Sequence, residues 1–366
     1  MIPSIAAFSD TYLPTLNGVT YTLDTWKKWW NIRGGEMHII YPQSKYDPKH
    51  GEWPVSSVPF PFYPGYRIAI PVNPDLPENV NIVHTHTPFS LGLAGQKLAK
   101  KYNLPLVASY HTPLSKYVYY ISPIDLVSRP LSKASNHWES RFLNHADLIL
   151  VHSNNALLNL REIGVTSPIT LLKNGIDISL FKPVETESFL TKYGIDPDQT
   201  ILGYTGRHSY EKNLHELIQS SPSLDATILI GGSGPARKHL EAQANDINAN
   251  IVFLGQLPRE ELPAFYSALD LFIFPSPVET QGLVALESIA CGTPVVAADQ
   301  GALLETVTNG VTGIHYQSEN TSSLIDKTLD SLSNRKQLCK NCISHRDSIS
   351  IDTTIDQLSQ LYLSLL

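Results

Sequence analysis

Two glutamates eight residues apart mark the stretch of this sequence that is best suited to chemistry. Glu279 and Glu287 lie within FPSPVETQGLVALESIACGTPVV, between an apolar run at 269–276 and a second one that begins at Pro294. This pattern predicts strand, loop, helix and strand in turn. Glu279 then lies in the loop at the carboxyl end of a strand, and Glu287 lies one to two turns into the helix. Ligands bind in that crevice in open α/β sheets.

The start of the predicted helix has the chemistry of a phosphate site. The backbone N–H groups around Gly282, Leu283 and Val284 lie in its first turn, where the helix dipole favours an anion. A carboxylate on the first turns can accept two hydrogen bonds from vicinal hydroxyls, such as those of a ribose. The stretch therefore suits a nucleoside diphosphate that carries a sugar. The structural alternative is that both glutamates are acidic residues that the helix dipole favours at a helix start.

A basic pair follows the first predicted strand of the second half of the chain. Arg207 and Lys212 lie in TGRHSYEKN, just before the helical pattern NLHELIQS. Arginine offers a planar fork of donors and lysine a compact charge, and both suit a diphosphate. Because basic residues at a helix start oppose the helix dipole, we expect an anion to bind there.

Two residues of the first half are weaker candidates. Gly18 opens a predicted helix, so its backbone can approach a phosphate without a side chain in the way. A plain helix cap is the alternative. His111 follows the apolar run LPLVASY, and from that position it can donate to a sugar hydroxyl or contact an anion. A structural histidine is the alternative there.

The candidate metal and dinucleotide motifs are incomplete. His84 and His86 share one face of an extended segment, but the sequence shows no third ligand beside them. Cys339 and Cys342 have the spacing of half a zinc site without a second pair. The glycines of 231–234 lack the third glycine of a dinucleotide fingerprint. We therefore predict neither a metal ion nor a nicotinamide cofactor.

Length and composition restrict the class of protein. The chain has 366 residues, of which 42% are hydrophobic and 17% charged, as in a globular protein of two domains. No apolar run has the length of a membrane span, and the N-terminus lacks the pattern of a signal peptide, so we expect a cytoplasmic protein. Residues 1–183 carry 16 Lys and Arg against 12 Asp and Glu, and the remainder carries 11 against 22. The acidic half argues against nucleic-acid binding, and the basic half is compatible with an anionic membrane surface.

Apolar runs alternate with helical patterns along both halves of the chain, which predicts parallel sheets wrapped by helices. The alternation restarts after a linker near residues 176–186. We therefore predict an α/β protein of two doubly wound Rossmann-like domains that face each other across a cleft. The Pro-rich segment 42–77 is expected to be irregular, with at most edge strands. The runs that read as strands are 2–9, 37–42, 80–87, 104–112, 146–153, 169–175, 200–207, 226–234, 250–257, 269–276 and 294–299.

Several motifs together resemble family four of the retaining glycosyltransferases, which have the GT-B architecture. They occur in the family's order and cover nearly the whole chain: YLPTLNGV, SYHT, LKNGID, TGR with EKN, GGSGP, FLGQLP and the pair of glutamates in ETQGLVALE. The family carries its last helix back to the first domain. The resemblance thus implies an acceptor domain of residues 1–183 with 350–366 and a donor domain of residues 184–349.

The resemblance also implies a role for each candidate residue. Arg207 and Lys212 would hold the donor diphosphate, with help from the amides at Gly18 and at 282–284. Glu287 would bind the ribose hydroxyls. The family needs no metal ion, so the nucleotide sugar is expected to bind without one.

The implied reaction is transfer of a hexose with retention of its anomeric configuration. Glu279 would contact the transferred sugar, and His111 would touch it from the first domain. The departing nucleotide carries negative charge that the basic pair and the helix amides would stabilise. Donors of the UDP-glucose type and of the GDP-mannose type both stay open.

The acceptor side most resembles the branch of the family that glycosylates lipids. The resemblance implies Tyr12 and Asn17 for the acceptor; many relatives have a glycine at position 17. Residues 97–141 carry seven Lys and Arg against two Asp and Glu, with tyrosines at 110, 117, 119 and 120. A basic and aromatic surface suits docking to an anionic bilayer, whereas its alternative is a solvated face beside core aromatics.

We therefore predict a hexosyltransferase that acts on a lipid or lipid-linked acceptor at the membrane surface. It would be cytoplasmic and peripheral on the inner face of the cell membrane. The alternatives are transfer to a soluble small molecule or a polysaccharide, and an inactive module that binds sugar nucleotides.

Overall fold

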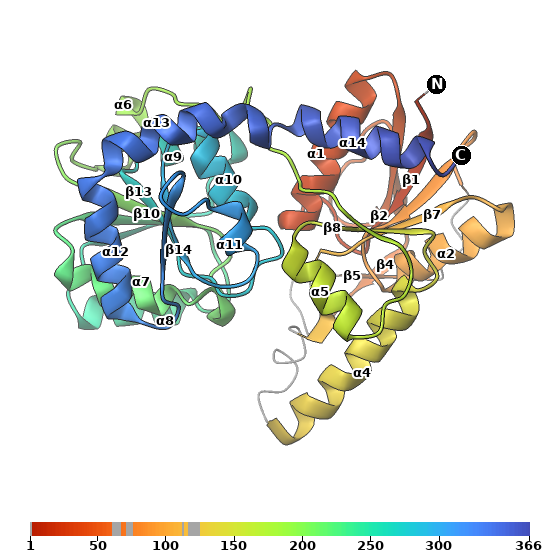
Figure 1. Cartoon of the computed structure of the whole chain (residues 1–366), viewed down its shortest axis with the longest axis horizontal. Helices are drawn as coiled ribbons and strands as arrows, with labels where there is room; N and C mark the ends of the chain where they lie inside the picture. Colours follow the sequence, from red (N-terminus) through yellow and green to blue (C-terminus); the bar gives the residue numbers. More distant parts are fainter. Residues whose placement is uncertain (1, 61–66, 71–75, 112, 116–124) are drawn as a thin grey trace. The chain divides into compact units, whose positions relative to one another are not determined.

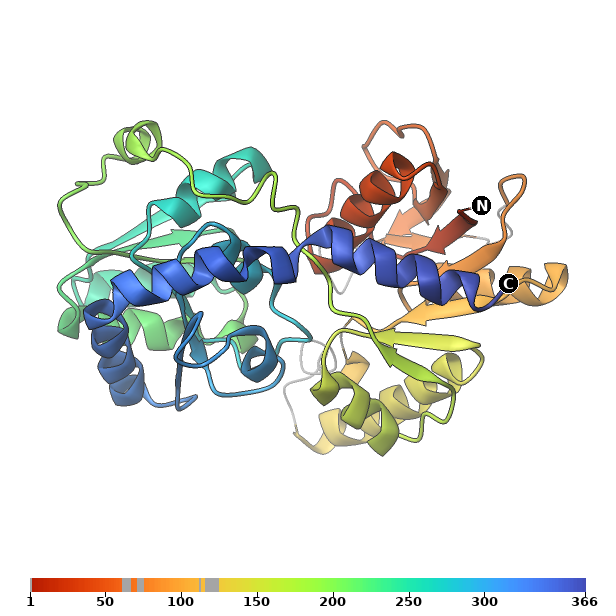
Figure 2. The same cartoon turned by 45° about the horizontal axis from the view of Figure 1, so that its top comes forward.

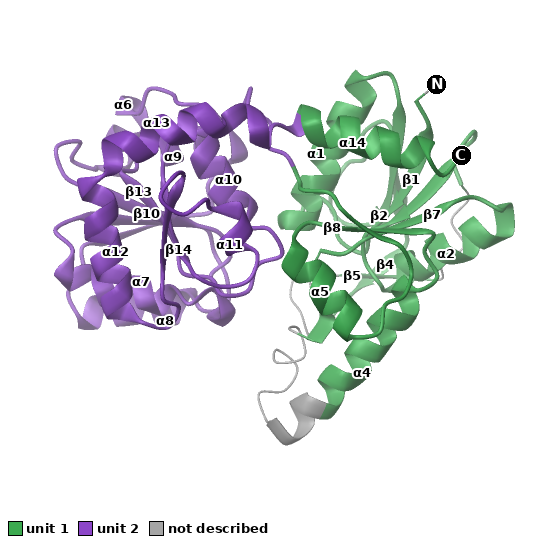
Figure 3. Cartoon of the chain, viewed as in Figure 1, with its two compact units in different colours: residues 1–174, 352–366 green, residues 175–351 purple. Residues whose placement is uncertain are grey.

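The computed structural model describes residues 2–60, 67–70, 76–111, 113–115 and 125–366. The chain folds into two compact units, drawn in green and purple in Figure 3. Unit 1 comprises Met1–Asn174 and Asp352–Leu366, and unit 2 comprises Gly175–Ile351. The assignment of residues 1–183 with 350–366 to one domain, and of residues 184–349 to the other, stays a prediction.

Unit 1 is built on a parallel sheet, several strands of which are labelled in Figure 1. The order of its strands is β3-β2-β1-β6-β7-β8-β9. All residues of β1, β6, β7 and β8 are buried, so both faces of these strands are covered, as is typical of parallel sheets. The strands are β1 (Ser4–Phe8), β2 (Glu36–Pro42), β3 (Glu52–Val55), β6 (Ile82–Thr85), β7 (Leu106–Ser109), β8 (Leu148–Val151) and β9 (Ile169–Leu171).

Within its described residues, the Pro-rich segment contributes only edge structure, as predicted. Its strand β3 lies at the edge of the sheet of unit 1, where proline is tolerated. The strands β4 (Ser57–Pro59) and β5 (Arg67–Ala69) form a small antiparallel pair outside the main sheet.

The helices of unit 1 pack through apolar and aromatic faces. In α1, the rings of Trp26 and Trp30 are fully buried. The last helix, α14, lies beside α1 in Figures 1 and 2, and Arg33 forms ion pairs with Asp352 and Asp356 on it. The helices are α1 (Gly18–Ile32), α2 (Ser90–Tyr102), α4 (Asp125–Leu143), α5 (Asn154–Glu162) and α14 (Ile351–Leu363).

Unit 2 is built on a second parallel sheet in the order β12-β11-β10-β13-β14-β15. The chain runs outward from β10 to β12, then returns to the other side of β10 with β13. The order of strands therefore reverses between β10 and β13, which makes that position a topological switch point. The strands are β10 (Ile201–Thr205), β11 (Thr227–Gly231), β12 (Ile251–Gly255), β13 (Leu271–Phe274), β14 (Val295–Ala298) and β15 (Gly313–Tyr316).

The α-helices and 3-10 helices of unit 2 precede, connect or follow these strands. They are α6 (Glu187–Tyr193), η1 (Tyr210–Lys212), α7 (Leu214–Ser220), η2 (Ser221–Ser223), α8 (Arg237–Asp246), η3 (Arg259–Glu261), α9 (Leu262–Ser267), α10 (Leu283–Ala290), α11 (Leu303–Thr306), α12 (Thr321–Ser333), α13 (Arg335–His345) and η4 (Arg346–Ile349). Each unit is a doubly wound Rossmann-like fold, which confirms the predicted fold class. Within the described ranges, no helix combines the length and apolar character that a membrane span requires.

Candidate active site

The strongest cluster of predicted residues lies at the switch point of unit 2. Lys212 follows β10, and Glu279 follows β13, which is the neighbour of β10 in the sheet. Their side chains form an ion pair, with 2.5 Å between Lys212 Nζ and Glu279 Oε1. These side chains are 19% and 14% exposed, so the pair is shielded but open to solvent. Two residues 67 positions apart in the chain are thus brought together at the edge where ligands bind.

Glycines shape the loop that carries Arg207. A Cβ atom on Gly232 would lie 1.9 Å from the carbonyl oxygen of Gly206, and one on Gly234 would lie 2.3 Å from that of His208. The His208 N–H donates to the Ser233 carbonyl at 2.9 Å. The glycines of 231–234 thus let two backbone segments pack directly. Their incomplete dinucleotide fingerprint is explained by this packing.

The N-terminus of α10 lies after the same loop as Glu279. Gly282 precedes the helix with a φ of +79°, in the left-handed region that favours glycine. A Cβ atom there would meet Leu303 Cδ2 at 2.8 Å and Phe274 Cε1 at 3.0 Å. Among the described residues, no side chain caps this helix. The amides of Leu283 and Val284, both partly exposed residues, are therefore placed to bind an anion.

Glu287 lies one turn further along α10 and is only 5% exposed. Its Oε2 accepts a hydrogen bond from the Tyr266 hydroxyl at 2.8 Å. Burial raises the pKa of Glu287, while the positive charge of Arg259 and the Tyr266 hydrogen bond act in the opposite direction. This carboxylate is held in one orientation, as a group that accepts paired hydroxyls needs to be.

The first loop of unit 1 places Gly18 at the exposed start of α1. No heavy atom of the described residues lies within 4 Å of the position that a Cβ of Gly18 would occupy, so among these residues nothing blocks a phosphate from this backbone. Asn17 is the N-cap of α1: its Oδ1 accepts from Thr20 N–H at 3.0 Å, and its Nδ2 donates to Thr11 Oγ1 at 2.8 Å. The side chain of Asn17 thus has a capping role, and its contact with an acceptor stays a prediction.

Tyr12 lies beneath this loop rather than on the surface. It is 4% exposed, and its hydroxyl donates to Glu52 Oε1 at 3.1 Å. Glu52 also forms a buried ion pair with Lys27 at 2.9 Å. The predicted role of Tyr12 toward an acceptor is not tested by these contacts.

His111 lies at the carboxyl edge of the sheet of unit 1, between two other histidines. Its Nε2 is 2.9 Å from His86 Nδ1, and its Nδ1 is 3.3 Å from His152 Nε2. Two further imidazoles, those of His111 and His152, thus lie near His84 and His86, which the sequence did not show. Within the described ranges, however, no group of histidine, cysteine or carboxylate side chains has the arrangement of a metal site.

His152 is a residue that the sequence reading missed. The sequence did contain a pattern that could have predicted this contact. His86, His111 and His152 follow the ends of β6, β7 and β8, respectively, by one or two residues. Parallel neighbours end at the same edge, so the side chains that follow them meet.

Cys339 and Cys342 lie on α13 and form no part of this site. Cys342 is fully buried, and its thiol donates to the Thr312 carbonyl at 3.5 Å. Burial raises the pKa of both thiols, which disfavours the thiolate form that binds metal.

The basic and aromatic surface predicted in residues 97–141 is supported only in part. Tyr110 is 5% exposed and belongs to the core, so its inclusion in that surface was wrong. The other tyrosines of the prediction, at 117, 119 and 120, lie outside the described residues. On α4, Leu131 and Trp138 are 39% and 40% exposed.

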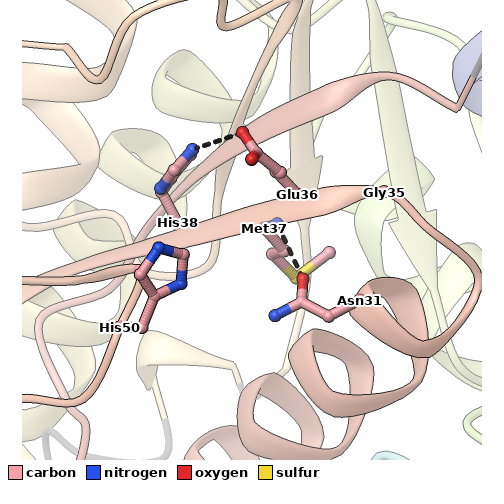
Figure 4. A pocket seen from close by; sticks show the side chains of 7 residues that line it. Asn31, Gly35, Glu36, Met37, His38 and His50 are labelled. Atoms are coloured by element: carbon pink, nitrogen blue, oxygen red, sulfur yellow. Dashed lines mark hydrogen bonds and ion pairs between the residues drawn. The ribbon is translucent and has the colours of Figure 1, made fainter.

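A small hollow lies at the opposite edge of the sheet of unit 1, where β2 begins (Figure 4). Its volume of about 220 Å³ is below the range usual for ligand pockets. Glu36 and His38 approach each other to 3.6 Å on its wall. The hollow is lined by Asn31, Gly35, Glu36, Met37, His38, His50 and Gly51. It lies at the amino end of β2, whereas the predicted site residues of unit 1 follow the carboxyl ends of strands.

Two Rossmann-like units, each built on a parallel sheet, are the architecture of the GT-B class of protein. Residues 16–180 match the sequence profile of Glycosyltransferase Family 4, and residues 185–346 match that of Glycosyl transferases group 1. The chain therefore belongs to glycosyltransferase family four, and it is a glycosyltransferase of the retaining GT-B type.

Curated relatives agree over most of the chain. An alpha-monoglucosyldiacylglycerol synthase of Streptococcus pneumoniae is 28% identical over 338 residues, which cover 86% of this chain and 76% of the relative. A GDP-mannose-dependent alpha-mannosyltransferase of Corynebacterium glutamicum is 28% identical over 325 residues, or 85% of this chain and 76% of the relative. A D-inositol 3-phosphate glycosyltransferase of Corynebacterium efficiens is 30% identical over 304 residues, or 77% and 70%.

Solved structures share the fold at lower sequence identity. The sucrose-phosphate synthase from Thermosynechococcus elongatus superposes with a TM-score of 0.81 at 22% identity, covering 99% of both chains. The HepE protein of Anabaena, in complex with UDP and glucose, gives 0.78 at 18% identity, covering 99% of this chain and 100% of that one.

Proposed function

We propose that this protein transfers a hexose from a nucleoside diphosphate sugar, with retention, to a lipid or lipid-linked hydroxyl at a membrane surface. One observation carries the donor half of the proposal. The Lys212–Glu279 ion pair and the uncapped start of α10 lie at the carboxyl edge of the sheet of unit 2, and the buried Glu287 lies one turn further along α10. A cation, free amides and a fixed carboxylate suit a diphosphate and the ribose attached to it.

In this proposal the donor displaces the ion pair. The diphosphate binds Lys212 and Arg207 together with the amides at the start of α10, which releases Glu279 to accept from hydroxyls of the sugar. Glu287, oriented by Tyr266, accepts from the ribose. Gly18 and His111 of unit 1 keep the roles that the family resemblance gives them, toward the diphosphate and the sugar respectively.

The chemistry of these groups serves departure of the nucleotide. As the bond between sugar and phosphate breaks, negative charge grows on the diphosphate, and cations with oriented amides stabilise it. The acceptor hydroxyl then attacks the face that the nucleotide left. No protein carboxylate is assigned as a nucleophile, and the diphosphate is held without a metal ion.

The donor proposal includes two nucleotide sugars. One relative is named for GDP-mannose, another for the glucosylation of diacylglycerol, and HepE was solved with UDP-glucose. We therefore propose UDP-glucose or GDP-mannose as the donor type.

An apolar patch on unit 1 supports a lipid surface as the place of reaction. Leu131 and Trp138 are seven residues apart on α4, so they share a helix face. Trp138 Nε1 donates to the Pro88 carbonyl at 3.0 Å, next to Phe89, which is 47% exposed. Lys133 and Arg141 are exposed on the same helix. An apolar face flanked by basic residues is typical of peripheral membrane proteins on anionic lipid.

Vesicle sedimentation tests the membrane half of the proposal. The full chain should sediment with anionic vesicles at low salt and be released at high salt, because screening weakens the basic contribution. Trp138→Ala should lower binding, whereas Trp53→Ala, at an exposed ring on the edge strand β3, serves as the matched control. If equal amounts of protein sediment with neutral and with anionic vesicles, and neither salt nor Trp138→Ala changes the amount, the proposal of a membrane surface is wrong.

A transfer assay separates lipid from soluble acceptors. The protein is given labelled UDP-glucose or GDP-mannose, in EDTA, with diacylglycerol vesicles or with inositol phosphate. The relative named for D-inositol 3-phosphate makes the soluble acceptor the second candidate. Label in the lipid phase supports the proposal, and label only in the soluble product replaces it with the second candidate.

A further inference from the structure

Four histidines of unit 1 form one contiguous stack at the carboxyl edge of its sheet. His84 lies in β6, His86 just after it, His111 after β7 and His152 after β8. Successive ring centroids are 4.1 Å, 5.2 Å and 5.0 Å apart. His84, His86 and His152 are at most 2% exposed, and only His111 is partly exposed. The partly exposed ring is thus held between two buried ones.

The contacts of the stack fix where each proton lies. His152 Nδ1 is 2.8 Å from the Leu172 carbonyl oxygen, which can only accept, so this nitrogen carries a proton. In a neutral ring the Nε2 of His152 is then an acceptor, and the His111 Nδ1 facing it at 3.3 Å must donate. By the same logic the Nε2 of His111 accepts from His86 Nδ1 at 2.9 Å.

The contacts of His86, at the far end of this row of hydrogen bonds, explain why donors and acceptors do not exchange roles along it. His86 Nε2 is buried and has no hydrogen-bond partner among the described residues. Reversal would place a proton on that nitrogen and bury an unpaired N–H group, which costs free energy. It would also leave His152 Nδ1 and the Leu172 carbonyl as two facing acceptors. One backbone carbonyl therefore sets the tautomer of three rings.

The Trp26 ring lies beside three of the four histidine rings and helps to hold them in place. The Trp26 ring centroid lies 6.0 Å, 5.9 Å and 6.5 Å from those of His84, His86 and His152. His84 is anchored separately, through the Tyr362 hydroxyl at 2.6 Å and the Ser109 hydroxyl at 2.8 Å. Burial disfavours an imidazolium ion in His84, His86 and His152.

We propose that His152 and His86 are positioning residues that hold His111 as a neutral ring protonated on Nδ1, with both ring nitrogens engaged inside the stack. This inference rests on the proposed function, in which His111 contacts the transferred sugar. The further inference is that the His111 ring is held in one position in the site and has no acidic proton to give to the substrate. Protonating its Nε2 would set two N–H donors against each other at the 2.9 Å contact with His86. His111 is therefore not a general acid toward the departing diphosphate.

Nuclear magnetic resonance tests the protonation states without a variant. Two-bond ¹H–¹⁵N correlation spectra of the ¹⁵N-histidine-labelled full chain at neutral pH report which ring nitrogen carries the proton. We expect the Nδ1–H tautomer for His86, His111 and His152. Assignment uses the loss of one set of signals in each His→Gln variant. A signal from His111 as the Nε2–H tautomer, or as an imidazolium ion, overturns the proposal.

Transfer kinetics test the positioning role. A glutamine at position 152 offers an amide oxygen where Nε2 lies, so His152→Gln should keep the Nδ1–H tautomer of His111 and most of the kcat. His152→Leu removes the acceptor, and its kcat should fall by about tenfold or more, because a ring displaced in the site is costly to the reaction. The affinity for the nucleotide should be unchanged in both variants. Equal kcat for His152→Leu and wild type overturns the role.

Failure of this inference is distinguishable from failure of the proposed function. If wild-type protein binds no nucleotide in calorimetry, the proposed function fails, and the role of the stack in transfer falls with it. If nucleotide binds and hexose is transferred while His111 shows the other tautomer, only the present inference is overturned.

Discussion

Lys212 and Glu279 form an ion pair with each other in the free protein, so a donor that binds both residues has to separate them. The 2.5 Å contact has to be exchanged for contacts with the ligand if both residues act on it. A diphosphate carries more charge than a carboxylate, so it competes well for Lys212. Binding of the diphosphate would then make Glu279 available to the sugar.

Replacing Lys212 tests the diphosphate contact. Lys212→Ala should weaken binding of the donor nucleotide by about 1.5–3 kcal/mol, the usual contribution of a charged hydrogen bond. Isothermal titration calorimetry measures the change. Lys327→Ala, at an exposed lysine paired with Asp330 on α12, is the matched control and should bind like wild type. An unchanged affinity in Lys212→Ala would show that this lysine does not hold the diphosphate.

Replacing Glu279 should separate nucleotide binding from transfer. Glu279→Gln leaves Lys212 without its ion-pair partner, so the affinity for the bare nucleoside diphosphate should stay equal or rise. The kcat should fall, because the carboxylate that accepts from the sugar hydroxyls is lost. Asp330→Asn is the matched control. A loss of nucleotide affinity with unchanged kcat would contradict the assignment of Glu279 to the sugar.

At the scale of elements, the N-terminus of α10 depends on one glycine. Gly282→Ala adds left-handed strain of about 1–2 kcal/mol and contacts with Leu303 and Phe274 that cost about 1–3 kcal/mol more. Gly194→Ala is a matched control, since Gly194 has a φ of +65° with nothing within 4 Å of its added Cβ. Urea unfolding should show the larger loss of stability in Gly282→Ala. Equal losses would mean that the packing around Gly282 adjusts freely.

The sequence predicted the elements that carry the proposed donor site because their patterns are local. An apolar run that ends in Ser-Pro and is followed by a glycine and a helical face gives β13, the loop and α10 in order. The edge strand β15 was not predicted, because GIHY is short and carries a polar residue. Its place beside β14 depends on tertiary pairing rather than on local pattern.

The sequence could predict which residues follow strands, but not which atoms meet. Lys212 and Glu279 were each expected at the crevice, whereas their ion pair follows from side-chain geometry that no motif records. Tyr110 was expected on a surface, yet the strand that it follows carries it into the core. His152 ends an apolar run like any other, so its meeting with His111 required the order of β6, β7 and β8.

At the scale of the whole molecule, the histidine stack makes folding stability depend on pH. Burial lowers the pKa of His84, His86 and His111 well below the usual 6.5, and that of His152 to about 4. Below pH 6.5 the unfolded chain binds protons that the folded chain does not. The contribution of these histidines to the free energy of unfolding should therefore be fully present above pH 6.5 and fall toward pH 4, by up to about 1.4 kcal/mol per pH unit for each histidine.

Buried carboxyl groups with a raised pKa oppose this trend, among them Asp10, Glu139 and Glu287. Burial raises the pKa of Glu139 to about 8 from the usual 4.5, so the folded chain binds its proton more tightly and stability falls as pH rises between these values. Glu139→Gln removes that contribution. Urea unfolding between pH 4.5 and 7 should therefore show a steeper dependence on pH in this variant than in wild type. A flat profile in Glu139→Gln would mean that the histidines are not buried as neutral rings.

Calorimetric titration with UDP and GDP, in EDTA, tests the central claim most directly, since that claim is a nucleotide-sugar site on unit 2. We predict that one of the two nucleotides binds without metal, and that Glu287→Ala abolishes its binding while Asp330→Ala does not. Near-native urea midpoints would show that both variants are folded. Failure of both nucleotides to bind wild type, or normal binding by Glu287→Ala, would contradict the account.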